Sequence, residues 1–370
     1  MPVKNQVGKT LLQKRKDYLG QTNGKVQEKY RGTLIGCAVG DTIGMPIEIW
    51  SRERIHKYVG RVEEPLDPIE IIPKDAEGQP LKQDEFGKFF EFTRHFEKGA
   101  ITDDTILTLA IAESIIDCQG INLDDIAKKH LEAFHKYKDK GGFGGTTVAA
   151  FRRLELGFPW YEAAISDGAG NGPAMKMSPI GLWTHATNNE QGLQAASMIG
   201  KITHKDIRSV TSGVIQAYLV DTLLRYEYLD KSNFFLSLGL ASYMEEDVNQ
   251  ETGLALLKPD ENLYSRIKWV IQNYDASSED AYRLLGNGGF VNESYPFALF
   301  MFQKYWDDPI EGLLEAVNFG GDSDTVGAMY GALAGAKNGM IWPENWVNTL
   351  IEKDRIINAA DGLYNLRRYP

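Results

Sequence analysis

The sequence has little of what disulfide frameworks, thiolate metal sites or membrane spans require. It holds only two cysteines in 370 residues, Cys37 and Cys118, which excludes a disulfide scaffold and a thiolate cage for zinc. No apolar run approaches the roughly 20 residues needed to cross a bilayer. The N-terminus MPVKNQVGKTLLQKRKDYLG carries lysines but no apolar centre, so it is not a secretory signal. We therefore expect a cytoplasmic protein with no membrane partner.

An excess of basic residues is also absent. The chain has 40 Lys and Arg against 51 Asp and Glu, a formal net charge of −11. This charge argues against sequence-independent binding of nucleic acid, which needs a basic field over the phosphates. The six histidines show no H-E-x-x-H or similar metal spacing. VGKT (7–10) lacks the earlier glycine of a phosphate-binding loop, and GAGNG (168–172) has no preceding strand, so neither predicts a nucleotide fold.

Helical patterns dominate what is present. Capping side chains followed by apolar residues at helical spacing predict helix starts at Asn122, Asp206, Ser277 and Asp308. Gly286 predicts the end of the helix that Ser277 opens. PIEII (68–72) lies between prolines and would be a short edge strand or a loop. We predict an all-α protein with a polar N-terminal extension over 1–25 and a single domain over 26–370.

Glycine gathers at particular places along the chain. These are GCAVGDTIG (36–44), GGFGG (141–145), GAGNG (168–172), GNGG (286–289) and FGGDSD (319–324). Glycine permits positive φ and close approach of the backbone to a ligand. The pattern predicts five loops between helices that line one surface cleft.

Three acidic segments are candidates for chemistry. Asp41 and Glu48 lie in GDTIGMPIE (40–48), TDDT occupies 102–105, and GDSDT occupies 321–325. Taken alone, each reads as an ordinary helix cap, turn residue or solvated side chain. Taken together they put two carboxylates plus hydroxyls at each of two helix starts, and adjacent like charges need a cation or donors to neutralise them. Oxygen ligands without thiolate or imidazole suit Mg²⁺ or Mn²⁺.

An ordered series of motifs resembles the ADP-ribosylglycohydrolase family, which includes the dinitrogenase-reductase-activating glycohydrolases and the ADP-ribosyl-acceptor hydrolases. The series runs from about residue 31 to 340 and consists of GDTIGMPIE, TDDT, GNGPAMKMSP (170–179), ITH (202–204), GNGGFVNESYPFAL (286–299) and GGDSDTVGAMYGALAGA. The resemblance implies a compact orthogonal helix bundle, in agreement with the helical pattern. It also implies two divalent cations, Mg²⁺ or Mn²⁺, held by Thr102, Asp103, Asp104, Asp322, Asp324 and Thr325.

The reaction implied by the resemblance is hydrolysis of the bond between C1″ of ADP-ribose and an acceptor. Glu48 and the bridging Asp324 would be the catalytic residues. The expected partner is an ADP-ribosylated protein, with arginine as acceptor, or a small-molecule substrate. Serine-linked ADP-ribose, a small ADP-ribosyl metabolite and a non-catalytic ADP-ribose binder stay open, as does the oligomeric state. Candidate substrate-binding residues are Asp41, Gly144, Gly145, Thr146, Gly170, Asn171, Gly172, Met175 and His204.

The sequence departs from the family pattern at three places. Lys176 follows Met175 where arginine is common, which removes the bidentate fork and weakens the case for a phosphate contact there. Lys205 stands where proline is commoner after the T-H element. The segment 52–100 is long and rich in phenylalanine, and would be a lid, extra core or an oligomer contact, with core or oligomer contact preferred.

Overall fold

Helices form the framework of the protein in the computed structural model, which describes residues 3–85, 87–88, 96–164, 168–189, 191–226, 230–241 and 262–367. Within these ranges there is no strand, and the all-α prediction is confirmed. The helices are α1 (Val3–Gly44), η1 (Met45–Ile47), α2 (Arg52–Tyr58), α3 (Asp103–Cys118), α4 (Leu123–Tyr137), α5 (Gly145–Glu155), α6 (Trp160–Ala163), α7 (Gly172–Lys176), α8 (Ser178–Thr187), α9 (Gly192–Lys201), α10 (Ile207–Arg225), α11 (Lys231–Ala241), α13 (Leu263–Gln272), α14 (Ser278–Leu285), α15 (Val291–Lys304), α16 (Pro309–Asn318), α17 (Ser323–Asn338), α18 (Glu344–Thr349) and α19 (Lys353–Asn365).

The four capping patterns each begin a helix where the sequence predicts one. The side chains of Asn122, Asp206, Ser277 and Asp308 accept hydrogen bonds from backbone N–H groups in the first turns of α4, α10, α14 and α16. Gly286 ends α14 with φ of 80°, a conformation that glycine adopts without strain. Residues 68–72 form turns, which is the loop alternative of the two predicted for PIEII.

The end of α1 packs against α17 through facing glycines. A Cβ atom added to Gly40 would lie 2.8 Å from the backbone nitrogen of Ala328, and one added to Gly36 would lie 2.8 Å from the carbonyl carbon of Gly331. Two helix backbones can approach this closely only where neither carries a side chain. The prediction that 36–44 is a loop lining the cleft is therefore wrong, because these glycines lie inside α1 and allow the two helices to touch.

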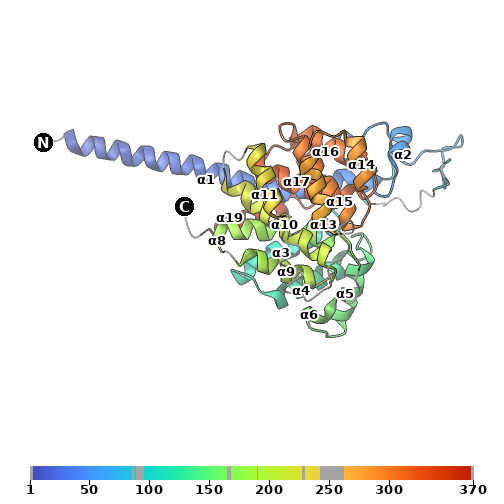
Figure 1. The fold of residues 1–370 in the computed structure, drawn as a ribbon, viewed down its shortest axis with the longest axis horizontal. Coiled ribbons are helices and arrows are strands. Elements are labelled where there is room, and N and C mark those ends of the chain that lie inside the picture. Colours follow the sequence, from blue (N-terminus) through green and yellow to red (C-terminus); the bar gives the residue numbers. More distant parts are fainter. Residues whose placement is uncertain are drawn as a thin grey trace.

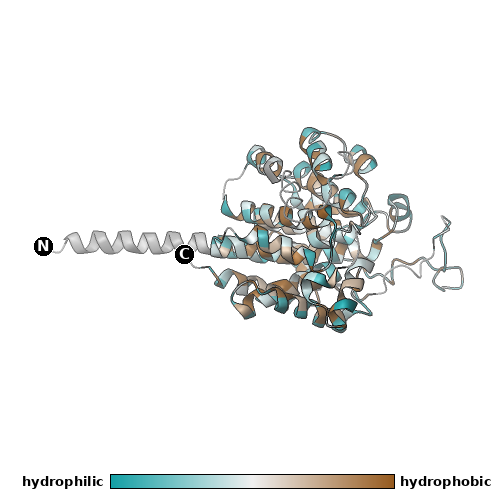
Figure 2. Cartoon of the chain, turned by 60° about the horizontal axis from the view of Figure 1, so that its bottom comes forward, coloured by the Kyte–Doolittle hydropathy of each residue, from teal (hydrophilic) through white to brown (hydrophobic). Residues whose placement is uncertain are grey.

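A shell of apolar side chains surrounds this helix pair. Figure 2 shows hydrophobic and hydrophilic stretches alternating along the helices of the body, the pattern of helices that bury one face. Fully buried aromatic residues from α15 and α17 include Tyr295, Phe297 and Tyr330. The first half of α1 projects away from this body (Figure 1). In the described part of the chain, every helix is too short or too polar to cross a membrane.

Two sequence predictions concern segments that the structure does not decide. The helix α1 runs without a break from Val3 to Gly44, and the domain boundary at residues 25 and 26 stays a prediction. In the phenylalanine-rich segment 52–100, four of the five phenylalanines (86, 89, 90 and 92) lie outside the described residues. Phe96 is described and lies beside Ala100 and Ile101 in the wall of a small cavity.

Candidate active site

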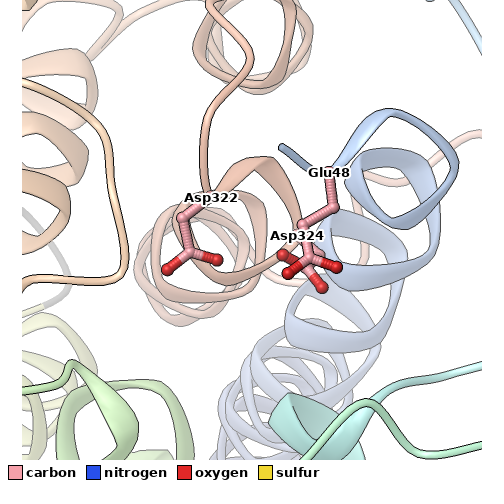
Figure 3. Close-up of side chains that lie close together, drawn as sticks. All are labelled: Glu48, Asp322 and Asp324. Carbon is pink, nitrogen blue, oxygen red and sulfur yellow. The ribbon is translucent and has the colours of Figure 1, made fainter. Parts of the chain in front are cut away.

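The packing of α1 against α17 brings the first and third acidic segments together. The chain leaves α1 through η1 to Glu48, and the backbone N–H of Ile49 then donates to the carbonyl of Gly321 at 2.7 Å. The carboxylates of Glu48, Asp322 and Asp324 offer oxygen atoms that all lie within 4.8 Å of one another. Figure 3 shows these three side chains gathered where α17 begins. Residues almost 280 positions apart in the sequence thus form one carboxylate cluster.

Asp41 joins the second acidic segment to this cluster by capping α3 from another helix. Its carboxylate accepts hydrogen bonds from the backbone N–H groups of Thr102 at 3.0 Å and Thr105 at 3.2 Å, and from the Thr105 hydroxyl at 2.6 Å. Asp41 is fully buried and lies outside the lining of the cavity described below. The structure thus places it behind the site, where it positions α3.

The structure does not support the capping interpretation for the residues at the N-cap positions of α3 and α17. Thr102 precedes α3 and Asp322 precedes α17, and neither side chain makes a capping hydrogen bond to its helix. Asp104 instead receives hydrogen bonds through Oδ2 from the hydroxyls of Thr102 at 3.1 Å and Thr325 at 3.3 Å. Its Oδ1 atom is buried, and among the described residues it has no hydrogen-bond partner. A buried carboxylate oxygen without a donor is unfavourable unless a proton or a cation binds it.

The acidic cluster disfavours its own ionisation. Burial, followed by repulsion from Asp324, raises the pKa of Asp41 to about 7 and that of Asp322 to about 7. The same two causes raise the pKa of Asp104 well above its usual value. Carboxylates in this state take up either protons or a bound cation.

The donor set fits divalent cations that prefer oxygen. Carboxylates of Asp103, Asp104, Asp322 and Asp324, with the Thr325 hydroxyl, provide hard ligands at the starts of α3 and α17. Four of these residues line a shared cavity, and Asp324 lies in the carboxylate cluster beneath it. The remaining predicted ligand, Thr102, is fully buried and donates its hydroxyl proton to Asp104. Its hydroxyl therefore supports the Asp104 carboxylate from behind.

One open cavity of about 460 Å³ lies over the cluster and joins it to four of the glycine-rich segments. Eight of the nine predicted substrate-binding residues line it: Gly144, Gly145, Thr146, Gly170, Asn171, Gly172, Met175 and His204. Glu48 also lines it, so the expected convergence of 141–145, 168–172, 286–289 and 319–324 on one cleft is observed.

The cavity also contains residues that the motifs do not single out. Ile49 is 62% exposed at its wall with a φ of 63°, a strained conformation for a β-branched residue. Thr147 lies in the first turn of α5 and lines the cavity as well. Thr147 follows the GGFGG segment after one intervening residue, Thr146. No sequence signal marks Ile49, because its conformation is imposed by the contact between η1 and the loop before α17.

The sequence matches a family model over most of its length. A family model described as ADP-ribosylglycohydrolase matches residues 22–370. The chain belongs to the ADP-ribosylglycohydrolase family. Membership supports an enzyme that hydrolyses ADP-ribose linkages.

Relatives match over most of their length. ADP-ribosylhydrolase ARH3 of Mus musculus is 27% identical over 343 residues, covering 86% of this chain and 86% of its own. The protein YegU of Escherichia coli (strain K12) is 26% identical over 316 residues, covering 85% of this chain and 88% of its own. A solved structure titled "ADP-ribosylglycohydrolase-related protein complex" has a TM-score of 0.65 at 24% identity, covering 93% of this chain and 99% of that one, and shows the same fold.

Asn171 holds the acidic cluster of this ADP-ribosylglycohydrolase in place from the third glycine-rich segment. Its side-chain amide donates to Asp322 Oδ2 at 2.5 Å and to the Ser294 hydroxyl at 2.9 Å. Its backbone N–H donates to the carbonyl of Gly289 at 3.2 Å. The G-N-G motif therefore connects the wall of the cavity to an expected metal ligand.

Lys176, the departure from the ADP-ribosylglycohydrolase pattern, does not reach the cavity. Its side chain is completely buried, and its ammonium group donates to the Thr203 hydroxyl at 2.9 Å. It is absent from the cavity lining of the described residues. The weakened case for a phosphate contact at this position agrees with the structure, in which the lysine supports the wall from behind.

Proposed function

We propose that the protein is a metal-dependent hydrolase that cleaves the glycosidic bond between C1″ of ADP-ribose and an acceptor, with ADP-ribosyl-arginine on protein as the substrate. The observation that carries the proposal is that a single cavity joins the acidic cluster to the N-terminus of α5. One end of that cavity is suited to cations and the other to an anion. ADP-ribose has a matching arrangement, a ribose diol at one end of a diphosphate.

Two divalent cations, Mg²⁺ or Mn²⁺, would be held by Asp103 and Asp104 from α3 and by Asp322, Asp324 and Thr325 at the start of α17. The buried, unpartnered Oδ1 atom of Asp104 supports this assignment. When bound, the ions would orient the ribose diol and a water molecule and act as Lewis acids.

The diphosphate would bind at the start of α5. Gly144, Gly145 and Thr146 line the cavity there, and the first-turn N–H groups of a helix have no acceptor within the helix. The first turn of α5 carries no acidic residue that would repel an anion. His204, whose ring lies behind Gly170 and Gly172, would provide a further polar contact from the opposite wall.

Glu48 is the residue placed to take part in the bond cleavage. It lies on the cavity wall above Asp322 and Asp324 and is partly buried. As the bond to the acceptor loosens, positive charge develops at C1″, and a carboxylate beside it can stabilise that charge or accept a proton from the attacking water. Asp324, at the centre of the cluster, would bridge the cations and keep them together.

The acidic wall supports a cationic acceptor. Glu48, Asp103, Asp104 and Asp322 line the cavity, and among the described residues that line it there is no lysine or arginine. Because the proposed cations would neutralise Asp103, Asp104 and Asp322, a guanidinium group would be attracted mainly to Glu48, an attraction that a serine hydroxyl or an acetyl ester lacks. This is the reason to place arginine ahead of the other acceptors.

Substrate turnover by matched variants tests the proposal. Wild-type protein with Mg²⁺ or Mn²⁺ is expected to release ADP-ribose from arginine-linked substrate faster than from serine-linked substrate or an acetyl ester. Asp324→Ala should abolish this, whereas Asp124→Ala, which removes an exposed first-turn aspartate of α4, should not. Equal rates for Asp324→Ala and wild type would refute the mechanism. Tight ADP-ribose binding with no cleavage of any linkage would establish a binding protein instead.

A further inference from the structure

Behind the cavity, buried polar side chains connect Lys176 to His204. Lys176 at the end of α7 is fully buried, an expensive position for an ammonium group. It donates to the Thr203 hydroxyl at 2.9 Å, and the same hydroxyl lies 2.9 Å from Nδ1 of His204. The three side chains thus form a continuous path from the interior to the cavity wall, which His204 lines although it is itself buried.

The hydrogen bonds in this path are donated in one direction, from Lys176 toward His204. Burial lowers the pKa of Lys176 to about 7. Below that pH its ammonium group can only donate, so the Thr203 oxygen accepts from Lys176. The hydroxyl has one proton of its own, and the only other polar atom that it contacts among the described residues is Nδ1 of His204. If Nδ1 carried a proton, the Thr203 proton would be buried without an acceptor, which is unfavourable. The satisfied arrangement has Thr203 donating to Nδ1 of His204.

The imidazole is neutral and its ring is fixed. Burial, followed by the nearby charge of Lys176, lowers the pKa of His204 to about 3, so at neutral pH the ring carries one proton. A Cβ atom on Gly172 would lie 2.7 Å from Cε1 of His204, and one on Gly170 would lie 3.1 Å from Nε2. The G-N-G backbone therefore packs close to the ring and restricts its movement.

We propose that Lys176 and Thr203 are positioning residues that hold His204 in the tautomer protonated at Nε2. In this tautomer His204 presents an N–H donor to the cavity. The donor suits an oxygen of an anionic ligand, and the choice of the ADP-ribose diphosphate as that ligand rests on the proposed function. The tautomer itself does not depend on the ligand.

This assignment also explains why lysine is acceptable where the family pattern has arginine. The position does not require a fork that grips phosphate, because its side chain never reaches the cavity. It requires a donor that cannot act as an acceptor, so that the Thr203 proton is directed toward His204. Both basic side chains satisfy that requirement.

Long-range ¹H–¹⁵N spectra of the imidazole rings in the ligand-free protein test the proposal. Comparison with His204→Gln assigns the signal among the six histidines. Wild type and Thr203→Ser, which keeps the hydroxyl, are expected to carry the proton on Nε2. Thr203→Val, of nearly the same shape, should give a mixture of tautomers or protonation at Nδ1. A wild-type ring protonated at Nδ1, or a Thr203→Val ring identical to wild type, would overturn the assignment.

Two further measurements separate this proposal from the general function. Lys176→Met removes the fixed donor and leaves Thr203 in place, and it should also increase the Nδ1-protonated form of His204. An unchanged tautomer would count against the positioning role of Lys176 even if Thr203→Val failed to fold. In turnover assays Thr203→Val should raise KM by roughly tenfold with little change in kcat, the effect of losing one oriented hydrogen bond, and Thr203→Ser should restore it. An unchanged KM would contradict the positioning role. Inactive wild-type protein would count against the proposed function, and the spectra would still decide the tautomer.

Discussion

The contact between α1 and α17 should determine the metal site, and Gly327→Ala tests this. Gly327 lies one turn into α17, just beyond Asp324. A Cβ atom there would lie 2.8 Å from the carbonyl carbon of Gly40 and 3.1 Å from its Cα, and closer still to the Gly40 carbonyl oxygen. All three atoms belong to the backbone of α1. No rotamer change can relieve the contact, so the two helices must separate.

The size of the effect follows from these distances. Ordinary van der Waals contact for such an atom begins at 3.4 Å, so α1 must retreat by more than about half an ångström. Overpacking of this kind costs about 1–3 kcal/mol, and here the upper half of that range is expected because backbone opposes the methyl group. Replacing glycine by alanine inside a helix stabilises the helix by up to about 1 kcal/mol, which offsets part of this cost. The net expectation is destabilisation by about 1–2 kcal/mol.

The separation should also weaken cation binding. Glu48 follows the end of α1, whereas Asp322 and Asp324 lie at the start of α17, so a shift between the helices opens the cluster directly. Misplacement of reacting groups by about 1 Å can reduce activity about a hundredfold, and a smaller shift should cost about tenfold in Mn²⁺ affinity. Urea unfolding and calorimetric Mn²⁺ titration measure the two quantities.

Gly24→Ala provides the matched control for this substitution. Gly24 also lies inside α1, but no atom lies within 4 Å of the position that its Cβ would occupy. The control should leave the stability unchanged or raise it by up to about 1 kcal/mol, with unchanged Mn²⁺ affinity. A Gly327→Ala protein as stable as Gly24→Ala, with wild-type Mn²⁺ affinity, would refute the reasoning that glycine contacts position the site.

Three other predictions concern the groups around the cluster. Folding raises the pKa values of Asp41 and Asp322 from 3.8 to about 7. The metal-free protein should therefore lose stability as pH rises from about 4 to about 7. Melting temperatures measured with EDTA and with Mn²⁺ should diverge over that interval. Asn171→Ala removes the amide that holds Asp322, so calorimetry should show a 10- to 100-fold loss of Mn²⁺ affinity in a protein that unfolds normally, and an unchanged affinity would exclude this support. Asp41→Ala should destabilise the fold by about 1–2 kcal/mol in urea because α3 loses its cap, and Asp41→Asn, which keeps an acceptor oxygen, should recover most of the loss; equal stabilities would argue against capping.

Local features of the fold are the ones that the sequence predicts well. Helices begin at Asn122, Asp206, Ser277 and Asp308 because each capping side chain accepts a hydrogen bond from a backbone N–H less than four residues further along the chain. The segment 36–44 failed for the opposite reason. Glycine is a poor residue for a helix interior, so its concentration there predicts a loop. Only the facing backbone of α17, almost 300 residues away, explains why these glycines are helical.

At the site, too, local features were predictable from the sequence and contacts between distant segments were not. Oxygen ligands at two helix starts were visible from residue type and spacing alone. The buried position of Asp41, its hydrogen bonds across to α3 and the burial of Lys176 were not, because each depends on which elements meet in space. Ile49 is the extreme case: its positive φ results from contacts on both sides of the chain and leaves no trace in local sequence.

The N-termini of α3, α5 and α17 lie at the cavity, and the first turns of these helices differ in charge. The first turn of α3 carries Asp103 and Asp104, and that of α17 carries Asp324, so each helix dipole is already opposed by negative side chains. The dipoles partly offset the repulsion between the crowded carboxylates, and the proposed cations would complete the neutralisation. The first turn of α5 has glycine and threonine with no acid, so its N–H groups are available to an anion from outside. Under the proposed function, this difference would orient a ligand that has a diol at one end and phosphates at the other. Introducing an acid at the start of α5, as in Thr146→Glu, should therefore weaken ADP-ribose binding while Mn²⁺ affinity stays unchanged; equal losses of both would show that the two ends are not independent.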